Sequence, residues 1–248
     1  MPRISKDFDE RRSEFLEATK SLCYAHGYKK MSVQMLTEKV NVAKGTFYHY
    51  FKSKEDLLYQ WVIHEIEQML PAQIKIAEDS NMNGIEKLNK SFQYGRDWKL
   101  DHMEFIVSAM QIMYGANNLE LRDMMIRQSA KMTEGYLSQI IQQGVEEGHF
   151  STRFPVQIAR KISQILMPFS DELSLIMINH YNGEKVTIHE AFNLIDIMHD
   201  TLERILGARP GSILLADKIF IQSLFDHISE LGQSVRKTKL PEGSSVLN

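Results

Sequence analysis

Residues that can do chemistry gather in a short stretch near the N-terminus, between residues 31 and 54. Lysine and threonine side chains there can donate hydrogen bonds to base edges or phosphates, and tyrosine and histidine can reach the sugar-phosphate backbone. Gly45 would let the main chain approach a partner closely. A helix beginning at Ser53, with Lys54 in its first turn, would form a phosphate clamp. This pattern indicates a surface for duplex DNA, and the residues predicted to face the duplex are Ser32, Lys44, Gly45, Thr46, Tyr48, His49, Tyr50 and Lys54.

Short helices are needed to present this surface. Apolar residues at helical spacing predict a helix from Phe8 to His26, which Gly27 ends because glycine adopts the left-handed C-terminal conformation without cost. Ser32 stands where it can cap a second helix of about two turns. Asn41 follows that helix, and asparagine suits the left-handed conformation that a sharp turn between helices requires.

A third helix is predicted from Lys44 to Tyr50, and it is too short to be stable alone. Its stability must therefore come from packing Phe47 and Phe51 on the first two helices, which leaves the opposite face for DNA. Two short helices joined by a sharp turn are typical of helix-turn-helix DNA-binding domains.

Charge is distributed unevenly along the chain. Residues 1–54 contain eleven Lys and Arg against six Asp and Glu, a balance of +5, whereas the remainder contains eighteen against twenty-six, a balance of -8. A basic module on an acidic body concentrates attraction to a polyanion in one place. The alternative is a surface whose charge is uneven by chance.

Two runs of sequence carry a family resemblance. They are G-Y-x-x-M-S-V from Gly27 to Val33 and N-V-A-K-G-T-F-Y-H-Y-F-K-S-K-E-D-L-L from Asn41 to Leu58. Together they closely resemble the DNA-binding domain of the TetR family of bacterial transcriptional regulators. The resemblance covers about Phe15 to Val62.

This chain departs from the family pattern at three positions. Asn41 stands where the family usually has Gly, Thr37 where it often has Ala, and Ala43 where it often has Ser. Alanine at position 43 lacks the hydroxyl that caps a helix and that family members often place on a phosphate. Ala43 is therefore not carried over as a side-chain contact.

The resemblance implies an all-α protein in two parts. We expect a three-helix helix-turn-helix domain at 1–52, a larger helical effector-binding and dimerisation domain at 53–233, and a disordered tail at 234–248. It also implies a homodimer on a palindromic operator, regulated by a small molecule and acting as a repressor. Two alternatives remain: a DNA-bound protein-interaction factor with no inducer, and a lipid-binding or enzymatic helical protein whose basic end is incidental.

Apolar periodicity without strand-like alternation predicts helices throughout the rest of the chain, about nine or ten in all. One long helix is predicted to start at Ser53 and to be kinked by Pro71. The helices Val156 to Tyr181 and Ile188 to Leu206 are apolar on more than one face, which indicates a partner. In the resembled family the corresponding region forms a four-helix bundle between two subunits.

The body contains most of the fourteen methionines. Flexible thioethers fill irregular cores, and they also line adaptable pockets for apolar ligands, so both interpretations stay open. The effector is expected to be largely apolar, and its identity is open. The residues predicted to line its pocket are Trp61, Trp98, Phe105, Met110, Met113, Tyr114 and Tyr136.

Neither a catalytic nor a metal site is indicated. H-E-x-x-H, G-x-x-x-x-G-K-[ST], G-x-G-x-x-G and G-x-S-x-G are all missing from the sequence, so we expect no enzyme and no cofactor. His199 and Glu203 are four residues apart, which favours a solvated helix face over a metal site. Cys23 is the only cysteine and is expected to pack in the core. Asp171 and Glu172, in the most apolar helix, favour solvent or an interface over a polar pocket.

The N-terminal residues contain no apolar run like that of a signal peptide. Nowhere in the chain does an apolar stretch approach the roughly 20 residues that a membrane span needs. We therefore expect a protein that works in the cytoplasm.

Overall fold

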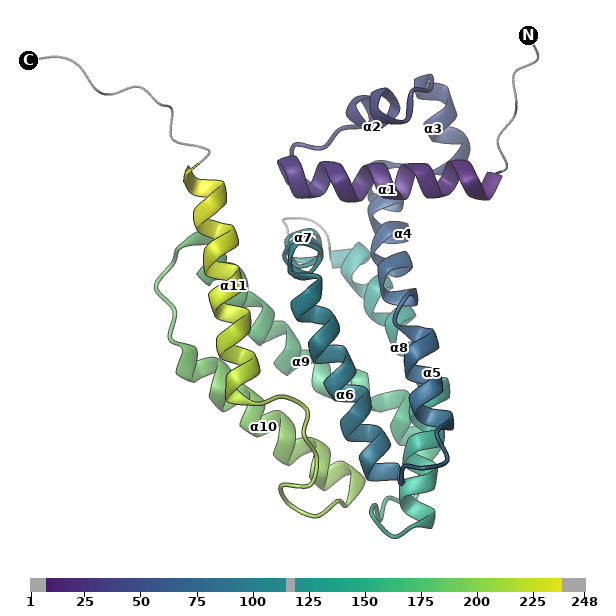
Figure 1. Ribbon diagram of the computed structural model, residues 1–248, viewed down its shortest axis with the longest axis vertical. Coiled ribbons are helices and arrows are strands. Elements are labelled where there is room, and N and C mark those ends of the chain that lie inside the picture. The colour runs from purple at the N-terminus through teal and green to yellow at the C-terminus, as the bar shows by residue number, and fades with distance from the viewer. Residues whose placement is uncertain (1–7, 115–118, 238–248) are drawn as a thin grey trace, which may run out of the picture.

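A computed structural model describes residues 8–114 and 119–237, and these residues form eleven helices and no strand (Figure 1). The all-helical prediction is confirmed. We call α1–α3 the N-terminal domain and α4–α11 the body. None of the described helices is both long enough and apolar enough to cross a membrane.

The N-terminal domain consists of α1 (Phe8–His26), α2 (Val33–Val40) and α3 (Lys44–Tyr50). α1 lies across one end of the body, and α2 and α3 lie on its far side, at the end of the molecule (Figure 1). The three helices begin and end where the sequence predicts. The sharp turn between α2 and α3 is therefore presented away from the body.

The chain enters the body through α4 (Lys54–Glu67) and α5 (Leu70–Glu78). A single kinked helix was the prediction for this region, and that prediction is wrong, because α4 ends three residues before α5 begins. Pro71 lies in the first turn of α5. Proline has no N–H to donate within a helix, and the first turn is where that loss costs least. This division brings the number of helices above the nine or ten expected.

The remaining helices fold into one bundle beneath the N-terminal domain (Figure 1). The last helix continues to Lys237, past the boundary expected for a disordered tail at 234, and residues 238–248 lie outside the described residues. The helices are α6 (Gly84–Asp101), α7 (Met103–Met113), α8 (Leu119–Glu146), α9 (Pro155–Asn182), α10 (Ile188–Leu206) and α11 (Lys218–Lys237).

Buried apolar side chains form two clusters. One fills the body between α5, α6, α7, α8, α9, α10 and α11. The other starts in the N-terminal domain and continues without interruption into the body, where it includes Trp61 of α4, Phe105 of α7 and Met125 of α8. The hydrophobic core thus crosses the domain boundary that we expect between residues 52 and 53.

Asp171, in the middle of α9, is half-buried and bonded on two sides. Its carboxylate accepts a hydrogen bond from Tyr114 Oη at 2.5 Å and forms an ion pair with Arg122. These bonds join α9 to the ends of α7 and α8 that lie nearest to it. Glu172 is exposed, as favoured from the sequence.

The N-terminus of α6 crosses α8 with their main chains in direct contact. A Cβ atom on Gly84 would collide with the main-chain nitrogen and Cα of Gly144. The N–H of Gly84 donates at 2.6 Å to the carboxylate of Glu147, the residue just after α8, and Asn83 with Glu86 completes a capping box. Glycine at position 84 is therefore required by the closeness of the two helices.

Replacing Gly84 by alanine should lower the free energy of unfolding by about 1–3 kcal/mol, because the added methyl group forces two main chains apart. Urea denaturation followed by circular dichroism measures the change. Gly135→Ala, in the middle of α8, is the matched control, since a Cβ there meets nothing within 4 Å. The control should leave stability unchanged or raise it by up to about 1 kcal/mol through helix propensity. Equal effects at both positions would contradict the close crossing.

Candidate nucleic-acid interface and effector site

The turn between α2 and α3 is fixed by two local devices. Ser32 Oγ accepts a hydrogen bond from the N–H of Met35 at 3.2 Å, so the predicted N-cap of α2 is confirmed. Asn41 has φ 56° and ψ 54°, which is the left-handed conformation predicted for it. Its N–H donates to the carbonyl of Glu38, and that of Val42 donates to the carbonyl of Thr37. These bonds hold α3 at a defined angle to α2.

α3 is anchored through one aromatic cluster. The side chains of Phe15, Phe47 and Phe51 are almost fully buried. The ring of Phe15 meets those of Phe47 and Phe51 edge-on, with 5.7 Å between ring centroids in each pair. Such edge-to-face pairs stabilise by about 0.5–1.5 kcal/mol each beyond the burial of area. The cluster supplies the packing that a seven-residue helix lacks by itself.

The opposite face of α3 is open. Lys44, Gly45, Tyr48 and His49 are exposed, and Thr46 is half-buried. The Tyr48 side chain is 53% exposed although it is aromatic. A Cβ on Gly45 would meet no protein atom within 4 Å, so the main chain itself is accessible there. The structure therefore brings these predicted contact residues together on one surface.

Tyr50 has a different position from the other predicted contact residues. Its ring packs against Phe8, with centroids 4.6 Å apart, and lies 6.0 Å from the ring of Phe15. Tyr50 is thus part of the contact between α3 and the start of α1. Phe8 also meets His49 edge-on at 6.0 Å. The sequence pattern pointed only to the spacing of Phe8 along α1, so its role against α3 was missed.

The N-terminus of α4 forms a second polar feature beside α3. Ser53 Oγ accepts from the N–H of Asp56 at 3.2 Å, which confirms the predicted cap. The Asp56 carboxylate accepts the N–H of Lys52 at 2.8 Å. Lys54 lies with its ammonium 5.9 Å from the ring centroid of Tyr28, a contact that limits where the charge can point. Lys54 is the first residue of α4, so its positive charge belongs to the N-terminal turn of that helix.

Two of the departures from the family pattern have a visible structural effect. Ala43 is the N-cap residue of α3 and has no side-chain hydrogen bond to the helix. Thr37 is buried, and its hydroxyl bonds to the carbonyls of Val33 and Gln34 in its own helix, so its polarity is satisfied. Of these two departures, it is the absence of a capping hydroxyl at position 43 that weakens the start of α3.

A buried carboxylate lies where the N-terminal domain meets the body. Glu65 of α4 accepts from Trp61 Nε1 at 3.1 Å and pairs with the Lys20 ammonium of α1 at 3.3 Å. Trp61 in turn meets Phe105 of α7 edge-on at 5.4 Å. α1, α4 and α7 are thus linked through one group of contacts. Burial also raises the pKa of the nearby Cys23 thiol to about 12, so this thiol stays protonated.

The residues predicted to line an effector pocket are divided between the two apolar clusters. Trp61, Trp98, Phe105 and Met113 pack with the cluster of the N-terminal domain, and Met110, Tyr114 and Tyr136 pack with that of the body. Burial raises the pKa of Tyr136 to about 12. In the structure these side chains take part in the packing of the core.

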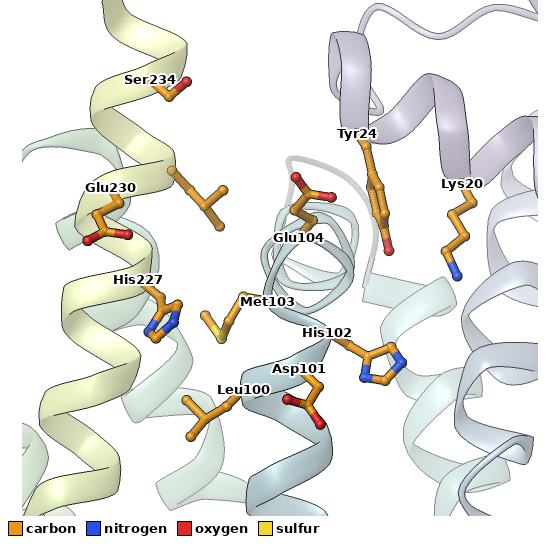
Figure 2. A pocket seen from close by; sticks show the side chains of 11 residues that line it. Lys20, Tyr24, Leu100, Asp101, His102, Met103, Glu104, His227, Glu230 and Ser234 are labelled. Carbon is orange, nitrogen blue, oxygen red and sulfur yellow. The ribbon is translucent and has the colours of Figure 1, made fainter.

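A cavity of about 580 Å³ lies between α1, the turn from α6 to α7, and the end of α11 (Figure 2). None of the residues predicted to line a pocket borders it. Within the described part of the chain, no three His, Cys, Asp or Glu side chains are placed to hold a metal ion. The cavity has apolar, acidic and basic side chains: Lys20, Tyr24, Leu100, Asp101, His102, Met103, Glu104, His227, Glu230, Leu231 and Ser234.

Comparison with known proteins identifies the N-terminal domain. Residues 15–60, which include all of α2 and α3, match the family model described as bacterial regulatory proteins, tetR family. The N-terminal domain is therefore a DNA-binding domain of the TetR type. The fatty acid metabolism regulator protein of Bacillus subtilis is 26% identical over 155 residues, which cover 60% of this chain and 75% of that protein. The transcriptional repressor KstR2 of Mycobacterium tuberculosis is 23% identical over 158 residues, covering 64% and 78%.

Solved structures of TetR-family regulators share the fold. A TetR transcription regulator from Haloarcula marismortui superposes with a TM-score of 0.55 and 16% identity, covering 92% of this chain and 98% of that one. The regulator FadR from Bacillus subtilis, solved in complex with stearoyl-CoA, gives a TM-score of 0.53 and 21% identity, covering 78% and 97%. The relatives are described as transcriptional regulators, and this chain shares their fold and their N-terminal DNA-binding domain.

Replacing Ala43 by serine should restore the missing cap of α3. The hydroxyl can accept a main-chain N–H of the first turn, and such a cap raises the free energy of unfolding by about 0.5–2 kcal/mol. Thermal or urea denaturation measures the gain. Ala43→Val is the matched control, because valine enlarges the side chain at this exposed site without adding an acceptor. A gain of the same size with valine would show that the cap is not its cause.

Proposed function

We propose that this TetR-family protein is a ligand-responsive repressor that binds a palindromic operator as a homodimer. The observation that carries the proposal is the open polar face of α3, fixed on its other side by the buried cluster of Phe15, Phe47 and Phe51. A rigid short helix with one exposed polar face suits insertion into the major groove. The protein would act in the cytoplasm, where bacterial DNA lies.

The contact residues divide by the part of the duplex that they would reach. Lys44 and Thr46, near the start of α3, would read base edges, while Tyr48 and His49 would contact the sugar-phosphate backbone. Lys54 would bind a phosphate together with the N-terminus of α4. Ser32 and the open main chain at Gly45 would add contacts, and the side chain of Tyr50 would support α3 from behind.

Dimerisation is supported by apolar side chains left exposed on the helices expected to form the interface. Ile165 and Leu175 of α9 and Ile197 of α10 are all exposed in the single chain. A second copy would remove them from water, as in a four-helix bundle between subunits. The two-fold axis would then place two copies of α3 about 34–36 Å apart, in successive major grooves.

For the effector we propose the class of long-chain acyl-CoA thioesters. Support comes from the relatives: one is a fatty acid metabolism regulator, and a structural neighbour was solved with stearoyl-CoA. The body core of this chain contains the flexible thioethers of Met103, Met110, Met177 and Met198, which can repack around an apolar chain. In this proposal residues 1–52 bind DNA, and residues 53–233 bind the effector and form the dimer.

Communication between the two parts would use the shared core. Phe105 of α7 packs on Trp61, and Glu65 of α4 holds Lys20 of α1. An effector that moved α7 would therefore move α4 and α1 with it. It would shift the DNA-binding equilibrium only by its difference in affinity for the two arrangements.

Lys54→Ala should weaken binding to every duplex sequence and reduce the slope of log affinity against log salt concentration by about one unit, because one phosphate contact is lost. Fluorescence anisotropy with a palindromic duplex at several salt concentrations measures the slope. Lys75→Ala, at an exposed lysine on α5, removes the same charge away from the proposed interface and should leave the slope unchanged. An unaltered slope in Lys54→Ala would rule out its phosphate contact.

Stearoyl-CoA should raise the thermal midpoint of the protein saturably and weaken its affinity for DNA by about 5- to 150-fold, the usual range of allosteric coupling. Differential scanning fluorimetry and anisotropy measure the two effects. Free coenzyme A is the control, since it has the same headgroup without the acyl chain. If no acyl-CoA gives a saturable shift while DNA binding persists, the chain is better explained as a DNA-bound interaction factor without an inducer.

A further inference from the structure

The segment between α10 and α11 is held in an unusual way. We call Ser212–Ala216 the strap; it has no helical structure and crosses the body at the end away from the N-terminal domain (Figure 1). Ile213 is only 1% exposed and Ala216 is buried, and both belong to the body core, while Leu214 is 56% exposed. The strap therefore closes one side of that core.

Two side chains of α6 bind the strap main chain. Asn89 accepts the N–H of Leu214 at 2.8 Å and donates to the carbonyl of Ser212 at 2.9 Å. Arg96 donates to the carbonyls of Leu214 at 2.6 Å and Leu215 at 3.0 Å. Four main-chain groups of the strap thus depend on two side chains from one helix.

Two side chains of α10 bind the strap from the other side. Glu203, which is buried, accepts the N–H of Ile213 at 3.1 Å. His199 Nε2 accepts the N–H of Ala216 at 3.2 Å. The sequence predicted that His199 and Glu203 share one helix face and favoured a solvated face for them. In the structure both side chains instead bind the main chain of the strap. Because a main-chain N–H can only donate, His199 must be neutral with Nε2 unprotonated for this bond to exist.

The charges around His199 come from two helices. Glu203 and Asp196 lie on its own helix α10 and favour the protonated ring, whereas Arg96 of α6 disfavours it. Desolvation by burial is the largest effect, and the pKa of His199 falls below its ordinary value of 6.5. Protonation would replace the acceptor by a donor facing the Ala216 N–H and would add a positive charge beside Arg96, the other main holder of the strap.

We propose that the strap is a pH-sensitive closure of the body core, released when His199 is protonated. A group that is neutral in the closed state and has a lowered pKa binds its proton more readily in the open state. The closed state is therefore fully favoured above pH 6.5 and loses stability as the pH falls below that value. This property of the fold goes beyond the proposed function and does not depend on which effector binds.

Hydrogen-deuterium exchange of the full-length protein tests the proposal. Exchange in peptides covering the strap is compared at about pH 7.5 and about pH 5.5, on the two sides of the ordinary histidine pKa, after correction for the intrinsic effect of pH on exchange. The strap amides should lose protection at the lower pH, because the open state binds the His199 proton more readily than the closed state. Peptides from the middle of α8 should keep their protection, which shows that the protein stays folded.

His199→Gln separates titration from simple packing. The glutamine oxygen can accept the Ala216 N–H but cannot be protonated in this range, so the strap should stay protected at both pH values. His189→Gln removes an exposed histidine from the same helix and should keep the wild-type response. The proposal is overturned if the wild-type strap is equally protected at both pH values, or if His199→Gln still opens at the lower one.

Discussion

The DNA-binding surface depends on one constraint, the inability of a seven-residue helix to stand alone. α3 exists because Phe47 and Phe51 lie beneath it and pack on Phe15 of α1. Because these rings occupy the inner face of α3, its polar residues lie on the outer face. The chemistry of the surface is therefore a consequence of which residues its helix must hide.

The same apolar cluster makes the N-terminal domain inseparable from the body. Trp61, Phe105 and Met125 extend it into α4, α7 and α8, so α7 has one side in contact with the domain that faces DNA. At its other end, Tyr114 bonds to Asp171 of α9. α7 thus connects the DNA-binding side of the molecule with the middle of α9.

Local signals in the sequence were sufficient for features that neighbouring residues determine. Ser32, Ser53 and Asn41 act through atoms three or fewer residues away, and the structure agrees with their predicted roles. Features set by distant segments could not be predicted. Nothing near Tyr50 in the sequence indicates that Phe8 would cover its ring.

Long-range contacts also explain why the strap could not be predicted from the sequence. His199 binds a residue seventeen positions away, and Asn89 binds residues more than a hundred positions away. The bulky residues predicted to line a pocket have the same helical spacing as core residues. Spacing alone cannot distinguish a helix face that contacts a ligand from one that contacts another helix. The kink expected at Pro71 is instead the start of α5, because whether a proline bends a helix or begins a new one depends on how the segments on both sides of it pack.

The crossing of Gly84 and Gly144 has a mechanical consequence. At this crossing no side chain separates the two main chains, so the helices cannot slide past each other by a change of rotamer. The crossing can therefore act as a pivot about which α6, 18 residues long, rotates. At 1.5 Å per residue the far end of α6 is about 27 Å from the pivot, and a rotation of about 5° would move it by about 2 Å. That far end turns into α7 beside the N-terminal domain (Figure 1). A rotation too small to disturb packing at the base would thus become a displacement as large as those that accompany helix shifts in allosteric proteins.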